Sequence, residues 1–253
     1  MSRRPIRLAV AAGFLLSLTL AGCAGQAVPD VSVQVGNGQA AAGNGQFALS
    51  LQLLLGLTVL SIAPAILLLA TSFTRIVIVL SLLRSAIGIP QLPPNQVILG
   101  LSLFLTLFVM TPVWLRINAD AVQPYLAGSI SQDVAVERGI VPLRGFMLAQ
   151  THERELALFI DLSKRDRPAT VSDIPTEVLL PAFVVSEVKT AFTMGFILFV
   201  PFLVIDLVVA SALMAMGMVM VSPVQIALPF KLLLFVLVDG WVLVVQSLVR
   251  SFG

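Results

Sequence analysis

Six charged residues interrupt long apolar stretches of the sequence, where their chemistry needs an explanation. They are Arg75, Glu187, Lys189, Asp206, Lys231 and Asp239. An unpaired charge at the centre of a bilayer costs about 3 kcal/mol or more. Such residues therefore form either a proton or ion relay or structural ion pairs. We favour ion pairs because the set contains both signs, and a relay stays open as the alternative.

The spacing of these charges predicts which of them pair. If a helical hairpin turns near residue 218, residues on its two arms lie at equal depth when their numbers sum to about 437. Asp206 then faces Lys231, and Glu187 faces Arg250. The rule leaves three charges without a partner, and these are predicted to contact neighbouring subunits: Arg75, Lys189 and Asp239.

Half of the methionines lie together at this predicted turn. They are Met214, Met216, Met218 and Met220. Alternate spacing does not line one face of a helix, so the side chains should project from a helix end or a loop. One interpretation is that methionine fills the gaps of an irregular turn. The other is that several copies around an axis form a soft collar, which holds back ions and yields to a passing polypeptide.

Apolar helices must position these residues. The chain is 58% hydrophobic and 11% charged, whereas about 25% charged is typical of soluble proteins. Two hydrophobic helical hairpins are predicted, at 47–115 with a proline-rich turn at 87–95, and at 181–253. In the first, the apolar run 47–83 contains Pro64 and Arg75 and exceeds the about 20 residues that cross a bilayer, so a kinked or over-long helix is expected. The sequence therefore predicts an all-α membrane protein.

A polar module at 116–180 separates the two hairpins. It holds seven basic and nine acidic residues. Apolar residues recur at helical spacing within 146–165, which predicts one or two amphipathic helices. Their apolar face should pack on the membrane helices or on a neighbouring subunit. The signal peptide described next would place this module in the periplasm.

The N-terminal residues 1–27 are typical of a signal peptide. Basic residues precede an apolar run that is too short to span a bilayer. The segment that ends at Cys23 also has the form of a lipobox, so ordinary cleavage and lipidation both stay open. Residues 28–46 are rich in Gly, Ala, Gln and Asn and are predicted to be a flexible linker.

No residue pattern in the sequence is typical of an enzyme. Cys23 is the only cysteine, and phosphate-binding loops, nucleophile elbows and metal-ligand spacings are absent. The only histidine, His152, is interpreted as a solvated side chain. The net charge of +2 comes from the N-terminal arginines. We therefore expect no catalytic residue, no metal, no cofactor and no nucleic-acid partner.

Several segments between 49 and 249, taken in their order along the chain, resemble the FliP family of flagellar export-gate membrane proteins. They include TSFTRIVIVLSLLRSAIG (71–88), PAFVVSEVKTAF (181–192), PFLVIDLVVASALMAMGMVMVSP (201–223) and LPFKLLLFVLVDGW (228–241). The sequence departs from the family at Val219, where a further methionine is common, and in the lipobox at Cys23. The segments cover most of the chain, so the resemblance is specific.

The resemblance implies a structural, pore-forming subunit of the flagellar type III export gate. About five such subunits wind with FliQ and FliR into a helical assembly in the bacterial inner membrane, at the flagellar basal body. Unfolded flagellar proteins pass through its channel, and other export subunits and membrane lipid contact it. The methionine loop is implied to be the channel gasket, chiefly through Met218 and Met220. The assembly lies largely above the bilayer plane, so the apolar arms need not be simple spans.

Two alternative functions stay open at this point. One is an ion or small-solute transporter that uses Asp206 and Lys231. It predicts a substrate pocket within one subunit and internally repeated halves. The other is the equivalent subunit of a virulence type III injectisome, although the N-terminal extension favours the flagellar machine.

Overall fold

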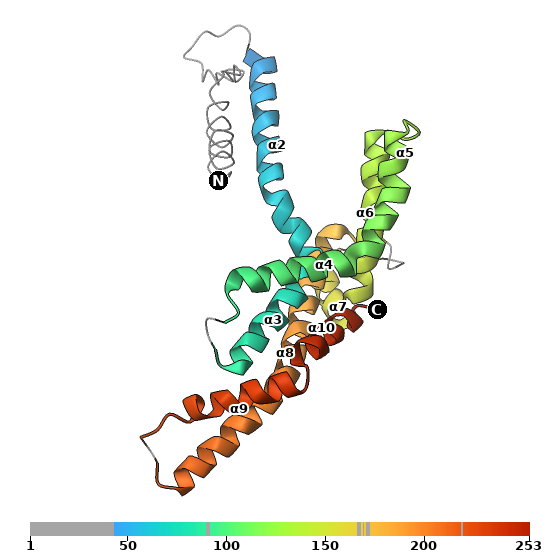
Figure 1. Cartoon of the computed structure of the whole chain (residues 1–253). Coiled ribbons are helices and arrows are strands. Elements are labelled where there is room, and N and C mark those ends of the chain that lie inside the picture. Colours follow the sequence, from blue (N-terminus) through green and yellow to red (C-terminus); the bar gives the residue numbers. More distant parts are fainter. Residues whose placement is uncertain (1–42, 90–91, 166–167, 169, 171–172, 219) are drawn as a thin grey trace, which may run out of the picture. The chain divides into compact units, whose positions relative to one another are not determined.

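The computed structural model describes residues 43–89, 92–165, 168, 170, 173–218 and 220–253. The regular elements among these residues are all helices (Figure 1), which confirms an all-α protein. The chain divides within helix α2 into a unit that ends at Leu54 and a unit from Leu55 to Gly253. The signal peptide and the linker up to residue 42 lie outside the described residues. Residues 43–46 belong to helix α2 rather than to a linker.

The first apolar stretch forms two helices, α2 (Gly43–Leu69) and α3 (Phe73–Ile87). The apolar run is divided between two helices, with Pro64 inside the 27-residue α2 and Arg75 inside α3. The chain breaks at Thr71. Its hydroxyl donates to the carbonyl three residues earlier at 2.9 Å and accepts from the amide two residues later at 3.4 Å. A hydroxyl that bonds nearby backbone groups competes with the helical pattern, so the break follows from this side chain.

Helix α4 (Asn95–Ile117) follows the proline-rich turn. Helix α3 ends at Gly88, whose φ of 90° is a left-handed conformation that favours glycine. Helix α4 continues through a π-helical turn, η2 (Asn118–Val122), into α5 (Gln123–Leu126). This helix therefore crosses the predicted boundary between the first hairpin and the polar module at residue 115.

Helices α6 (Gln132–Gln150) and α7 (Glu153–Leu162) occupy much of the predicted polar module. Helix α6 runs back along α4 and η2, and α7 packs on α8 (Figure 1). Met147 of α6 and Phe159 of α7 pack in one cluster with Phe183 of α8. The sequence left open whether the apolar face of this module packs on the membrane helices or on a neighbouring subunit. In the structure it packs on α8 of the same chain.

The last third of the chain forms α8 (Thr176–Ala215), α9 (Pro223–Leu237) and α10 (Gly240–Arg250). Helix α8 has 40 residues and is therefore about 60 Å long, whereas the hydrocarbon core of a bilayer is about 30 Å thick. Only part of α8 can lie in that core. Its first half packs against α6 and α7, and α9 returns beside its second half (Figure 1).

The predicted returning arm of the second hairpin is not straight. Helices α9 and α10 meet at an angle of 64°, and Asp239 between them has a left-handed φ of 51°. A Cβ atom on Gly240 would overlap the ring of Phe235. The bend therefore depends on a glycine that lets α10 start directly against the side of α9.

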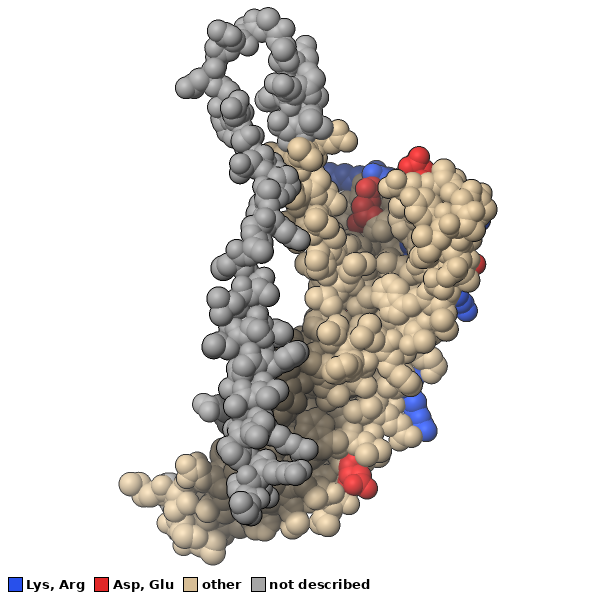
Figure 2. All heavy atoms as spheres, turned by 45° about the horizontal axis from the view of Figure 1, so that its top comes forward, with Lys and Arg blue, Asp and Glu red and all other residues tan. Residues whose placement is uncertain are grey.

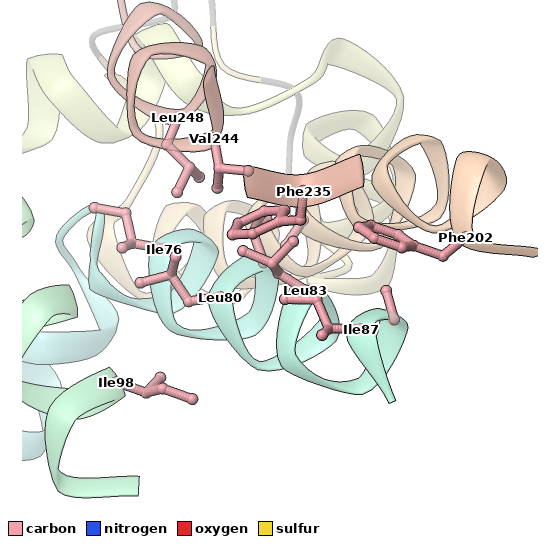
Figure 3. Packing of buried hydrophobic residues seen from close by; sticks show 12 residues of the cluster. Ile76, Leu80, Leu83, Ile87, Ile98, Phe202, Phe235, Val244 and Leu248 are labelled. Carbon is pink, nitrogen blue, oxygen red and sulfur yellow. The ribbon is translucent and has the colours of Figure 1, made fainter. Parts of the chain in front are cut away.

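The centre of the unit from Leu55 to Gly253 is an apolar cluster. Helix α3 places side chains three and four positions apart toward α8, α9 and α10, which is one face of a helix (Figure 3). The buried residues labelled there are Ile76, Leu80, Leu83 and Ile87 of α3, with Ile98, Phe202, Phe235, Val244 and Leu248. Each such side chain contributes about 1.5–3 kcal/mol when it is buried.

Much of the remaining apolar surface is exposed. Three helical segments of the described chain are long and apolar enough to cross a membrane: Leu51–Leu69, Asn95–Leu126 and Thr176–Ala215. The bent pair α9 and α10 would be a fourth if it acts as one span. Figure 2 shows a face of the described residues on which charged side chains are few. Soluble monomers rarely expose so much contiguous apolar surface, so this surface requires lipid or other proteins.

Candidate functional site

Arg75 of α3 and Glu187 of α8 form a buried ion pair. Their exposed fractions are 2% and 0%. The Arg75 Nε–H group donates to Glu187 Oε2 at 3.0 Å, and an Nη2–H group donates to Oε1. Two parallel hydrogen bonds of this kind are the strongest form of an arginine–carboxylate contact. The pair links the first turn of α3 to the first half of α8.

This pair corrects two predictions. Glu187 does not pair with Arg250, and Arg75 is not available to another subunit. The chain does reach the level of Glu187 here, because Ser251 bonds to the same Arg75. The Arg250 side chain, however, is exposed, and Arg75 of α3 occupies both carboxylate oxygens of Glu187.

Asp206 and Lys231 lie in contact, as the depth rule predicted. The Lys231 Nζ atom donates to Asp206 Oδ2 at 2.7 Å, and the rule holds here because α8 and α9 run side by side near their turn. Lys231 is 4% exposed and also donates to the carbonyl oxygen of Ala86 at 3.4 Å. That carbonyl belongs to the last turn of α3, where the helix dipole favours a cation. Lys231 therefore joins three helices.

Lys189 also has a partner within the chain, which contradicts its prediction as an unpaired subunit contact. Its Nζ atom donates to Glu155 Oε1 of α7 at 2.6 Å. This hydrogen bond lowers the pKa of the Glu155 carboxyl, against the opposing effect of burial. The resulting contribution to α7 docking is present above the ordinary pKa of about 4.5 and is lost as the pH falls through the lowered value.

Asp239 and Arg250 are the two predicted charges that form no ion pair within the described part of the chain. Both are exposed. They flank α10, whose outward side chains Trp241 and Val242 are also exposed. Charged side chains therefore border an exposed apolar surface at both ends of α10.

A polar junction around the break between α6 and α7 was not predicted from the sequence. Gln150 Oε1 accepts a hydrogen bond from Arg75 Nη2 at 3.0 Å. The backbone N–H of His152 donates to Ser186 Oγ at 3.0 Å, and that hydroxyl donates to the carbonyl of Gln150 at 3.2 Å. The His152 ring contacts Ser186 through Nδ1, so it is not simply a solvated side chain. The available signal was the polar pair Ser186 and Glu187 in an apolar helix.

The four methionines project from the end of α8 and the turn that follows it. All four are exposed, and Met220 is fully so. Val219, the position where the sequence departs from the resembled family, lies outside the described residues. The described turn thus presents its thioethers for contacts outside the chain.

Comparison with known proteins identifies the chain at the family level. The model of the FliP family matches residues 56–248. The chain belongs to the FliP family. This match confirms the resemblance, and it spans the four methionines and six of the seven predicted charges, all except Arg250.

Curated FliP-family relatives cover most of the chain. A flagellar biosynthetic protein FliP of Pectobacterium carotovorum subsp. carotovorum is 58% identical over 210 residues, which cover 83% of this chain and 81% of that protein. The protein of the same name from Bacillus subtilis (strain 168) is 53% identical over 203 residues, covering 80% and 92%. That of Aquifex aeolicus (strain VF5) is 47% identical over 247 residues, covering 97% of each chain.

The described part of this FliP-family chain has few of the residue groups that bind a metal ion or a small substrate. No group of three or more His, Cys, Asp or Glu residues there could hold a metal ion. An open groove of 470 Å³ between α8 and α9 is lined by apolar side chains, among them Met216, Ile226 and Phe230. Such a groove suits helix packing or lipid. It lacks the polar groups that orient a small substrate.

Proposed function

We propose that the chain is a pore-forming structural subunit of the flagellar type III protein export gate and has no enzymatic activity. The observation that carries this proposal is an identity of 47–58% to flagellar biosynthetic proteins FliP over most of the chain. Three candidate membrane spans and the exposed apolar surface support a place in the cell membrane at the base of the flagellum.

The proposed assembly contains about five copies together with FliQ and FliR. Other export subunits and membrane lipid surround it, and unfolded flagellar proteins pass through it. The exposed apolar side chains support this, because a lone chain would leave them without a partner. Asp239 and Arg250 are the proposed charged contacts between subunits. The signal peptide and the periplasmic position of the segment 116–180 belong to the same proposal.

The exposed methionine turn is proposed to be the gasket of the closed channel. Met214, Met216, Met218 and Met220 are flexible, polarizable side chains on one turn. Copies arranged around an axis would bring such turns together. The contacts could then exclude water at rest and part for an unfolded chain.

The alternative of a small-solute transporter is less well supported. It needs a polar pocket within one subunit, whereas the groove beside Asp206 and Lys231 is lined by apolar residues. The two charges are also occupied with one another. The injectisome alternative is disfavoured because the relatives named above are flagellar proteins.

Deleting the gene tests the proposed function. We expect the deletion to abolish swimming and the secretion of filament protein, and a plasmid copy to restore both. Swimming is measured as spreading in soft agar, and secretion is measured by immunoblot of the culture medium. A deletion strain that swims normally would refute the function, and normal growth on single nutrients is the control against a transporter defect.

The gasket is tested by Met218→Ala combined with Met220→Ala. We expect the complex to assemble in normal amounts, because both side chains are exposed in the single chain. The membrane should become permeable to ions, since the shortened side chains leave a gap at the channel axis. Permeability is measured by the growth of induced cells and by a membrane-potential dye, with Met147→Leu in the core as the matched control. An ion-tight double variant that still exports would rule out the gasket.

A further inference from the structure

Helix α10 is joined to the rest of the chain through a bend that does not by itself fix its direction. Asp239 has a left-handed backbone, and Gly240 touches the Phe235 ring. Beyond this point only one side of α10 is buried, through Val244 and Leu248. A short helix packed along one face gains a second fixed point if the residues that follow it are also held.

That second point is Arg75, which holds the residues that follow α10. An Arg75 Nη1 group donates to the carbonyl oxygen of Ser251 at 2.8 Å and to its Oγ at 3.0 Å. The guanidinium carbon lies 4.0 Å from the centre of the Phe252 ring. Gln150, itself bonded to Arg75, donates from Nε2 to the carbonyl oxygen of Phe252 at 3.0 Å. The Phe252 ring also stacks on Phe146, with centroids 6.2 Å apart.

Arg75 makes five hydrogen bonds through its guanidinium group in these contacts. An arginine has five N–H donors in a rigid fork. Two of the five hydrogen bonds go to Glu187, one goes to Gln150 and two go to Ser251. Neutralising Glu187 requires only the charge and the first two bonds. The other three have the further effect of joining α6 and the residues after α10 to α3.

We infer that Arg75 is a positioning residue that sets the direction of α10 by holding Ser251 and Phe252. The outward face of α10, with Trp241, Val242 and the exposed Arg250, is thereby presented in the same direction by every copy. This inference rests on the proposed function, because the value of a fixed α10 face lies in the assembly. The contacts themselves belong to the single chain.

Two substitutions can distinguish the effect of the Arg75 charge from the effect of its planar, five-donor guanidinium group. Arg75→Lys keeps a cation beside Glu187 but removes the planar guanidinium group, so the contacts with Ser251 and Phe252 are lost. Arg84→Lys is the matched control, since Arg84 lies on the same helix and donates to the Asn95 side chain at the α3–α4 turn, far from these contacts. Both are made in full-length chains that carry Cys23→Ser, Gly145→Cys and Gly253→Cys; these two positions adjoin Phe146 and Phe252, and a Cβ atom there meets no atom within 4 Å. A bis-maleimide then reports whether the segments around residues 146 and 252 remain neighbours.

We expect Arg75→Lys to lower the yield of this cross-link at least five-fold in membranes, with chain levels within two-fold of the parent. Arg84→Lys should leave the yield unchanged. Joining the two cysteines as a disulfide in the Arg75→Lys chain should restore co-purification of tagged with untagged copies. An unchanged cross-link yield in Arg75→Lys would overturn the inference, and so would a disulfide that forms without restoring co-purification. The cross-link is read on the chain alone, so its outcome is independent of whether the gene deletion abolishes swimming.

Discussion

Replacing Glu187 with leucine should largely prevent the chain from accumulating in the membrane. Glu187 is fully buried and supplies both carboxylate oxygens to Arg75. Removing one partner of a buried ion pair leaves the other charge without compensation and typically costs about 3–5 kcal/mol. Whole domains are stable by only about 5–15 kcal/mol. The expected result is a severe loss of folded chain, measured by immunoblot of membranes and by denaturant unfolding of the purified chain in detergent.

Glu177→Leu is the matched control for this prediction. Glu177 lies on the same helix, and its ion pair with Arg165 is exposed on both sides. Exposed pairs contribute about 0–1 kcal/mol, so this variant should accumulate normally. A double variant, Arg75→Met with Glu187→Leu, should recover part of the loss because no charge is left buried. Equal effects of Glu187→Leu and Glu177→Leu would contradict the buried pair.

Lys231→Met is expected to have the second largest effect. The Lys231 ammonium is almost fully buried and bonds both Asp206 and the last turn of α3. Its loss leaves the partly buried Asp206 carboxylate without a counter-charge and places an apolar side chain at the end of the α3 dipole. We expect a destabilisation of about 3 kcal/mol and loss of swimming. Asp206→Asn keeps a hydrogen-bond acceptor for Lys231 but removes its counter-charge, so the buried ammonium is left uncompensated and a loss of similar size is expected.

Exchanging the two charges tests whether they act as a pair. Asp206→Lys combined with Lys231→Asp should restore part of the stability that either single change loses. Recovery should be incomplete, because an aspartate at 231 would face the carbonyl of Ala86 instead of donating to it. Lys189→Met is the control, since Lys189 is half exposed and its loss should be smaller. A double variant no more stable than the singles would show that the two charges do not depend on one another.

The sequence by itself determined the class of protein and the local features of its fold. The excess of apolar residues predicts membrane helices, because no soluble fold could bury so many. The breaks between helices within 87–95 and near residue 218 were correctly predicted, because proline and glycine stop helices through their own backbone geometry. The contact between Asp206 and Lys231 followed from counting back from a turn, which is reliable only close to that turn.

Only the tertiary structure decided the partner of Glu187 and the path of the last helix. Arg75 and Glu187 are 112 positions apart, and no periodicity connects side chains over such a distance. The bend at Asp239 depends on Gly240 meeting a ring of the preceding helix, which is a packing contact and not a local propensity. Arg250 lies next to Ser251, which bonds to Arg75, but its own side chain is exposed. Local backbone chemistry sets where helices begin and end, whereas the pairing of buried charges is set by how helices pack.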